Sequence, residues 1–319
     1  MKRRRSLAPL LVATALQGAA PAASAAWALA YEQSFAGGGA LDASFWRQET
    51  GLQRNREAQS YQPGNVMVQG GVLRIEARRE TVPNPHWRAS SGDWRLSRRE
   101  SSYSSGAIVS RAPLRFARVE IVARTPSGAG VWPALWLVHE AAGEYGEIDL
   151  FEAVGKHPDT VFAGVHWGTD PRTRKHRNDS RVVPGFEGRW HTHTLEWTPS
   201  AVTISLDGRP WYRFDPDDAR LPGGIDPLRR PMHLRINLAL GGSWGGDIDD
   251  GKLPARFDIA SVRVWNWADG DNDAAAAPVR TSPGQPVRPP EPAAEKSDAM
   301  PAAPAESAQT RRPPVRWGR

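Results

Sequence analysis

The segment GEIDLFE at residues 146–152 carries three acids, Glu147, Asp149 and Glu152, among three large apolar residues. In a regular strand, side chains alternate between two faces, which would bury the last acid and expose the phenylalanine before it. Burying an unpaired carboxylate is costly. One extra residue at Leu150–Phe151, a β-bulge, would turn all three acids to one face and the apolar residues to the core. Bulges are common beside active sites.

Three carboxylates on one strand face suit glycoside hydrolysis. A retaining enzyme needs a nucleophile and an acid/base whose carboxyl groups are about 5–5.5 Å apart, and the outer pair, Glu147 and Glu152, would fill these roles. Like charges raise one another's pKa, so Asp149 between them would help to keep Glu152 protonated while Glu147 stays ionised. Taken alone, the pattern also fits a solvated strand face or a site for a hard cation.

Aromatic residues surround this segment in the sequence. In GVWPALWLVH, Trp132 and Trp136 fall on one face of the expected strand. Flat aromatic surfaces with a few polar groups are typical of a polysaccharide cleft, although either tryptophan could instead fill the core. His166 could bond a sugar hydroxyl or be structural, and Trp244, in a glycine-rich loop, could offer a stacking platform or belong to an ordinary turn.

The elements that position these residues are predicted to be short strands. Strand-like runs separated by turn residues recur along the body of the chain, and no segment shows a helical period over a dozen residues. Gln69-Gly70-Gly71 and Asp207-Gly208 are hairpin signals. We therefore expect residues 26–267 to form one all-β domain, a sandwich of two antiparallel sheets packed face to face. The clearest runs are 65–78, 117–124, 201–214 and 260–265.

The two ends of the chain differ from the body in composition. Residues 1–25 have a basic start, an apolar run too short to span a bilayer and a small-residue cleavage site, which is typical of a secretory signal peptide. No later segment is long and apolar enough to span. Residues 268–319 are rich in proline and alanine and poor in large apolar residues, so we expect a disordered tail. The sequence thus predicts a secreted protein, periplasmic or extracellular.

Charge and cysteine content exclude several function classes. The formal charge is +6, but four of the positive residues lie in the leader. The cluster RTRKHR at 172–177 has acids on both sides and is interpreted as a solvated loop rather than a polyanion contact, so we expect no nucleic-acid partner. With no cysteine, the chain has no disulfide, no thiolate nucleophile and no cysteine-based metal site.

Several segments together resemble one known family. GEIDLFE resembles the signature of glycoside hydrolase family 16, in the bulged form with two residues between the aspartate and the second glutamate. The similarity to bacterial laminarinase-like endo-β-1,3-glucanases extends over most of the body. It is carried by NREAQSYQPGNVMVQGGVLRIEA, YSSGAIVS, RVEIVARTPSGAGVWPALWLV, HTHTLEWTPSAVTISLDG and INLALGGSWGGDIDD.

The resemblance implies a β-jelly-roll sandwich with a substrate cleft across its concave sheet, and net retention through a covalent glycosyl-enzyme. Carried over by motif, Glu147 is the nucleophile, Glu152 the acid/base and Asp149 a helper. The positions that match sugar-holding residues of the family cleft are Asn55, Trp132, Trp136, His166 and Trp244.

The sequence departs from the family pattern in two places. IASVRVW has Ala260 where the family often has an aspartate that helps to bind a structural calcium, and Asp258 lies two residues earlier. This departure makes the structural calcium, which the family pattern would allow, doubtful. We expect no required cofactor and assign no metal ligands. The insert at 83–101 is unusually basic and carries tryptophans, so it leaves the shape of the cleft near it open.

Together these features predict a retaining endo-glycosidase that hydrolyses internal β-1,3-glucosidic bonds of laminarin-type glucans. The same motif also fits a hydrolase or transglycosylase acting on another glycan, such as mixed-linkage glucan or an agar-type galactan. The bulged spacing argues against mixed-linkage lichenases, whose signature usually lacks the extra residue. A non-catalytic glucan-binding module is a further alternative, although such modules typically lose one of the acids. We expect a monomer whose partner is the polysaccharide.

Overall fold

The computed structural model describes residues 27–268 together with 280 and 281. The predicted signal peptide and most of the predicted tail lie outside these residues. Within the tail, β18 (Arg280–Thr281) pairs in parallel with β1 (Trp27–Ser34). In the described part of the chain, no helix is long and apolar enough to cross a membrane.

Two sheets form the body of the protein, as predicted. The larger contains eleven strands among the described residues. Besides β1 and β18 these are β3 (Ser60–Tyr61), β4 (Val66–Gln69), β5 (Val72–Pro83), β6 (Glu100–Ser105), β8 (Ala117–Arg124), β13 (Trp190–Thr198), β14 (Ala201–Leu206), β15 (Arg209–Phe214) and β17 (Ala255–Trp267).

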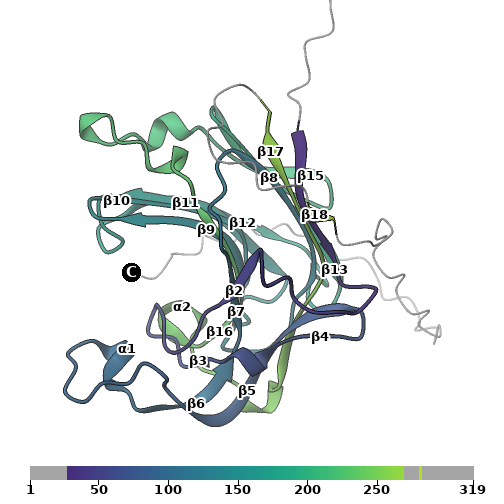
Figure 1. Cartoon of the computed structure of the whole chain (residues 1–319), viewed down its shortest axis with the longest axis vertical. Coiled ribbons are helices and arrows are strands. Elements are labelled where there is room, and N and C mark those ends of the chain that lie inside the picture. Colours follow the sequence, from purple (N-terminus) through teal and green to yellow (C-terminus); the bar gives the residue numbers. More distant parts are fainter. Residues whose placement is uncertain (1–26, 269–279, 282–319) are drawn as a thin grey trace, which may run out of the picture.

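The second sheet has seven strands in the order β12-β11-β10-β9-β16-β7-β2, all paired antiparallel. They are β2 (Trp46–Gln48), β7 (Ala107–Ser110), β9 (Val131–Ala141), β10 (Glu144–Glu152), β11 (Thr160–Gly168), β12 (Lys175–Val182) and β16 (His233–Leu240). Figure 1 shows this sheet facing the layer that contains β8, β13 and β17.

The helical segments are short, in agreement with the lack of helical periodicity. They are α1 (Trp94–Ser97), α2 (Gly242–Gly245) and the 3₁₀ turns Pro63–Asn65, Pro216–Ala219, Pro222–Gly224, Pro227–Arg229 and Asp250–Lys252. α1 belongs to the basic insert and lies at the edge of the molecule, away from the layers of the sandwich (Figure 1).

The hairpins follow the turn chemistry of the sequence. β4 and β5 are joined at Gly70 and Gly71, and β14 and β15 at Asp207 and Gly208. Asp207 and Gly208 both have positive φ, 51° and 73°, as the two-residue turn that matches the twist of paired strands requires.

The main core fills the space between the two sheets. Fully buried side chains from both layers meet there, for example Ile121 and Trp197 from the larger sheet and Leu135 and Ile236 from the smaller. Two smaller clusters lie apart from this core and are built on the opposite face of β9, around Trp132 and Trp136. The cleft therefore lies on the face of the seven-stranded sheet that points away from the main core.

Candidate active site on the concave sheet

The predicted bulge is present in β10. Against β9, Asp149 pairs with Trp136 and Phe151 pairs with Leu135, which leaves Leu150 as the extra residue. The pairing with β11 shifts at the same place. Ile148, Leu150 and Phe151 are all buried in the main core, at most 1% exposed. The bulge thus removes the apolar residues from the face that carries the acids, as the cost of a buried unpaired carboxylate required.

All eight residues predicted for the site line one cleft of about 970 Å³. They are Asn55, Trp132, Trp136, Glu147, Asp149, Glu152, His166 and Trp244. A volume of this size is within the range of small-ligand and cofactor sites, and the strands β9, β10, β11 and β16 supply its floor.

Glu147 is held by a residue that sequence reasoning missed. The hydroxyl of Tyr145 donates a hydrogen bond to Oε2 of Glu147. Burial, and then the charge of Glu147, raise the pKa of Tyr145 far above its usual value, so the phenol stays a donor. Tyr145 precedes Glu147 by two positions and so shares its strand face, a spacing that could have revealed it.

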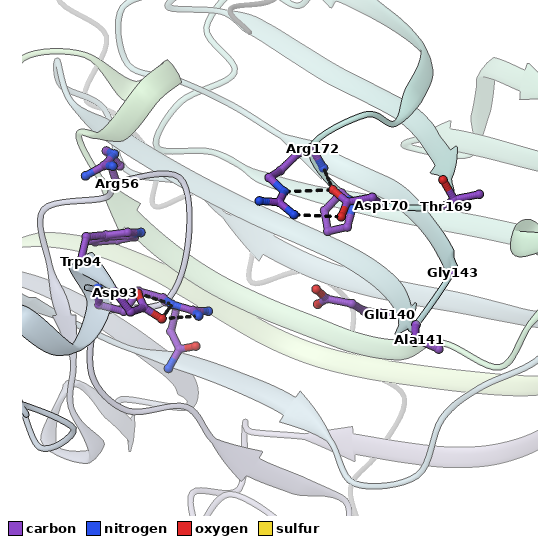
Figure 2. A pocket seen from close by; sticks show the side chains of 13 residues that line it. Arg56, Asp93, Trp94, Glu140, Ala141, Gly143, Thr169, Asp170 and Arg172 are labelled. Carbon is purple, nitrogen blue, oxygen red and sulfur yellow. Dashed lines mark hydrogen bonds and ion pairs between the residues drawn. The ribbon is translucent and has the colours of Figure 1, made fainter. Parts of the chain in front are cut away.

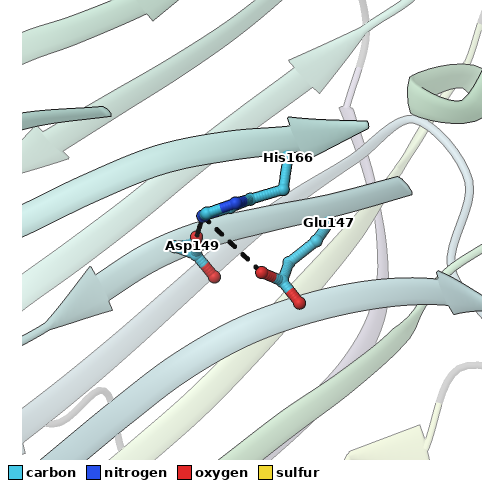
Figure 3. Close-up of side chains that lie close together, drawn as sticks. All are labelled: Glu147, Asp149 and His166. Atoms are coloured by element: carbon cyan, nitrogen blue, oxygen red, sulfur yellow. Dashed lines mark ion pairs between the residues drawn. The ribbon is translucent and has the colours of Figure 1, made fainter. Parts of the chain in front are cut away.

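His166 lies across from the acids on β11, as Figure 3 shows. Its Nε2 is 3.1 Å from Oδ2 of Asp149 and 3.7 Å from Oε1 of Glu147. Nε of Arg174 donates to Nδ1 of His166 at 3.1 Å. Because an arginine can only donate, Nδ1 must accept, so the proton of the neutral ring is on Nε2. Burial lowers the pKa of His166, which favours this neutral form.

The same three side chains have the makeup of a small metal site. Glu147, Asp149 and His166 each bring one ligand atom within 4.8 Å of the others. A metal would need a free lone pair on the histidine nitrogen that faces the acids. With Nδ1 accepting from Arg174, the proton of the neutral ring lies on Nε2, and a metal could bind there only if that proton were lost.

The electrostatics of the other two acids favour proton transfer. Burial, followed by the charge of Glu147, raises the pKa of Asp149 well above its ordinary value. Burial, then the charge of Asp149, likewise raises the pKa of Glu152. Nε1 of Trp132 donates to Oε1 of Glu152 at 2.9 Å, so a proton on this carboxyl belongs on the other oxygen. A carboxyl that remains protonated towards neutral pH is what a general acid needs.

Trp132, Trp244 and Asn55 form one wall of the cleft. The rings of Trp132 and Trp244 meet edge to face, with centroids 5.2 Å apart. The carbonyl oxygen of Asn55 accepts from the backbone N–H of Ser243 at 2.9 Å, which ties its loop to α2. Asn55 has φ 52°, in the left-handed region that asparagine tolerates better than most residues. All three residues line the cleft, and their contact with a sugar stays a prediction.

Trp132 and Trp244 are 8% and 7% exposed, and Trp136 on the cleft floor is buried to a similar degree. It is 9% exposed, and its Nε1 donates to Oδ1 of Asn237 at 2.7 Å. The guanidinium carbons of Arg54 and Arg235 each lie 5.1 Å from its ring centroid. The two arginines were not among the predicted site residues, because their approach depends on how β16 and the loop before β3 sit against β9.

The basic insert widens the cleft at one end. A second pocket of about 880 Å³ adjoins it and shares five lining residues with it: Gln53, Arg95, Glu140, Pro171 and Arg172. Figure 2 shows Asp93 and Trp94 of the insert on one side of this pocket and Asp170 and Arg172 on the other. All six residues of RTRKHR are exposed, as a solvated segment should be, and Arg172 and Arg174 among them also line the cleft.

A β-sandwich that presents three clustered carboxyl groups to a tryptophan-bearing cleft is the arrangement expected of a glycoside hydrolase. The model of the glycosyl hydrolases family 16 matches residues 55–255, and the chain belongs to this family. Its substrate is accordingly a polysaccharide.

Comparison with individual proteins gives the same family. The chain is 32% identical to a β-glucanase of Rhodothermus marinus over 291 residues, which cover 84% of this chain and 96% of that protein. The X-ray structure of the laminarinase from Rhodothermus marinus superposes with a TM-score of 0.63 and 32% identity, covering 76% of this chain and 99% of that one. A structure from work on endo-acting O-glycanases of the human gut microbiota gives a TM-score of 0.69 at 26% identity, covering 79% and 94%.

Proposed function

We propose that this glycoside hydrolase is a secreted, retaining endo-β-1,3-glucanase of the laminarinase type. The observation that carries the proposal is the bulge at Leu150, which turns Glu147, Asp149 and Glu152 together into the cleft. The similarity to a β-glucanase and to a laminarinase over most of the body supports the choice of a β-glucan as substrate.

In the proposed mechanism, Glu147 attacks the anomeric carbon while Glu152 gives its proton to the leaving glycosidic oxygen. Glu152 then accepts a proton from the water that hydrolyses the glycosyl-enzyme. Asp149 helps by raising the pKa of Glu152, and His166 holds Asp149 through its Nε2 proton. The chemistry requires only these side chains and water, so we propose that no metal or cofactor takes part.

Sugar rings on either side of the cleaved bond are assigned to the walls of the cleft. Trp132 and Trp244 supply aromatic surface, and Asn55 supplies polar contacts. We also assign Trp136 and His166 to substrate binding. Trp136 would act together with the two arginines that cover its ring.

The experiment is product analysis on a panel of laminarin, mixed-linkage glucan and agar-type galactan. Internal cleavage should shorten laminarin chains rapidly and release reducing ends, and NMR of the first products should show the β-anomer. Release of the α-anomer would contradict retention, and activity on a different member of the panel alone would contradict the laminarin assignment.

A hydrolase of another glycan is the second candidate. It is favoured by the structural similarity to endo-acting O-glycanases and by the arginines beside Trp136, which differ from the open aromatic floor expected for a neutral glucan. The same panel, extended with a mucin O-glycan, distinguishes the two candidates by the substrate that is cut fastest.

A further inference from the structure

One row of paired residues runs across the concave sheet from the acids to its edge. Asp149 on β10 pairs with Trp136 on β9, Trp136 with Arg235 on β16, and Arg235 with Val109 on β7, which also pairs with Arg47 on β2. Adjacent strands are about 4.8 Å apart, so Arg235 begins about 10 Å from Asp149. The row places a cation near the reaction centre but not at it.

The positive charge in this part of the cleft exceeds the negative charge bonded to it. Glu49 accepts from both Arg54 and Arg235, the latter through Nη1 at 2.5 Å. Arg47 is exposed and has no ion pair with another described residue. One carboxylate is thus bonded to two of the three guanidinium groups that line this part of the cleft, and the third has no bonded acid among the described residues.

The other acids nearby compensate Arg54 more than Arg235. Glu57 lies beside Arg54, is bonded by Asn55, Gln59 and Tyr61, and has a pKa that burial raises. Burial lowers the pKa of Arg235. Glu49 and, more weakly, Glu140 oppose this effect, whereas the charges of Arg54 and Arg47 add to it. Nε of Arg235 and Nη1 of Arg54 are both buried and have no hydrogen-bond partner in the described part of the chain. Of these two arginines, Arg235 has the weaker compensation, because Glu57 lies beside Arg54.

A neutral sugar does not explain this arrangement well. Guanidinium groups cover the ring of Trp136, which would otherwise be the stacking surface. Two buried cations that share one bonded carboxylate keep part of their burial cost. An arginine fork matches the geometry of carboxylate and sulfate oxygens. Neutral hydroxyls could be recognised by amides such as that of Asn237 without this cost.

We propose that Arg235, with Arg54 and Arg47, forms a subsite for an anionic group carried by the glycan, a carboxylate or a sulfate ester on a sugar near the cleaved bond. This inference rests on the proposed function, because it assigns a substituent to the polysaccharide that the acids cleave. The enzyme would then prefer a substituted glucan to the plain polymer.

The test compares kcat/KM on three substrates: laminarin, laminarin oxidised to carboxylates at its primary hydroxyls, and laminarin sulfated to the same degree. The readout is the ratio of each substituted substrate to the plain one, so that general losses of activity cancel. In Arg235→Leu this ratio should fall about tenfold or more, the size expected when a charge-assisted hydrogen bond is lost. A change confined to one of the two substituted substrates identifies the anion.

A second variant keeps the proposal testable if Arg235→Leu does not fold, because it should change the ratio in the opposite direction. Glu49→Gln removes the shared counter-charge, so the ratio should rise rather than fall. Added NaCl should lower the ratio in the wild type because salt screens the attraction. Arg213→Gln, an exposed arginine on β15 outside the cleft, is the matched control and should leave the ratio unchanged.

Two outcomes separate this inference from the proposed function. Equal ratios in the wild type, Arg235→Leu and Glu49→Gln would overturn the anionic subsite while leaving the glucanase proposal intact. No release of reducing ends from any of the three polymers would overturn the glucanase proposal itself, and the subsite with it.

Discussion

Two buried aspartates on opposite sheets have pKa values shifted in opposite directions. Asp149 in the cleft is 5% exposed and Asp258 on β17 is 2% exposed. The pKa of Asp149 is raised by burial and by Glu147. Burial acts to raise the pKa of Asp258 too, but hydrogen bonds from Arg74 and Arg124 outweigh it and lower that pKa. Two aspartates with similarly low exposure thus have opposite pKa shifts, because Asp258 accepts hydrogen bonds from two arginines and Asp149 accepts none from any arginine that the structure describes.

The difference separates a structural acid from acids suited to chemistry. Asp258 accepts from Nε of Arg74 at 2.7 Å and from Nη2 of Arg124 at 2.7 Å, and it joins three strands of the larger sheet. Among the described residues, no arginine donates to the three acids of the cleft. Their bonded partners are Tyr145, Trp132 and the neutral His166, which leaves the acids able to exchange protons.

The largest expected effect comes from the acid assigned as nucleophile. Glu147→Gln keeps the shape of the side chain but cannot form the glycosyl-enzyme, so kcat should fall by at least about 10³-fold. Initial rates of reducing-end release from laminarin, with unfolding curves to check that the variant is folded, measure it. Wild-type rates in this variant would show that Glu147 is not the nucleophile. The acids of the cleft would then not differ from Asp258 in their role in the reaction.

Asp258→Asn is the matched change on the other sheet. It leaves two guanidinium groups without their carboxylate, and breaking a buried pair in this way costs about 3 kcal/mol of unfolding free energy, whereas kcat should stay as in the wild type. The pKa of Asp258 is lowered from 3.8 on folding, so its contribution to stability is present above about pH 4 and is lost as the pH falls through the lower folded value.

Urea unfolding at neutral and at acid pH checks this prediction. The stability gap between the wild type and Asp258→Asn should narrow as the pH falls below 4. A gap that stays constant with pH, or a variant as stable as the wild type at pH 7, would show that the two arginines do not stabilise the charged form of Asp258.

The sequence predicted the features that depend on neighbouring residues and missed the contacts between residues far apart in the chain. The bulge at Leu150 followed from the cost of burying Glu152, and the strands at 117–124 and 201–214 followed from alternation and turn residues, which act within a few positions. Arg74 lies 184 residues from Asp258, a contact that depends on strand order. No period along the chain carries that information.

Arg174 shows the same limit within the site. It belongs to a basic cluster whose composition is typical of a solvated loop, yet it reaches the ring of His166 because the segment between β11 and β12 folds back over the sheet. Arg235 was missed for a related reason: it meets Trp136 only through the pairing of β16 with β9. Tyr145, by contrast, could have been found from its spacing to Glu147.

Arg174→Met should have an intermediate effect on activity. It tests whether Arg174 keeps the ring of His166 neutral with its proton on Nε2. It removes the donor that fixes the proton of His166 on Nε2, and it removes a charge that lowers the pKa of that ring. We expect kcat/KM on laminarin to fall by about tenfold, the size of one charge-assisted hydrogen bond. Nitrogen-15 NMR of the imidazole should show a mixture of tautomers and a higher pKa. Unchanged nitrogen shifts would mean that Arg174 does not set the tautomer, whatever happens to the rate.

The smallest expected effect comes from removing the hydrogen bond that Trp132 donates to Glu152, the proposed acid/base. The hydrogen bond from Trp132 lowers the pKa of Glu152 against the larger effect of burial. In Trp132→Phe the carboxyl loses this donor, so its pKa should rise. Because Glu152 must be protonated to act as the acid, the basic limb of the kcat/KM profile should move to higher pH.

Asp149→Asn should move the same limb to lower pH, since it removes a charge that raises the pKa of Glu152. Two limbs moving in opposite directions would establish that the neighbours of Glu152 set its proton affinity, whereas limbs that coincide with the wild type would assign the acid to another group.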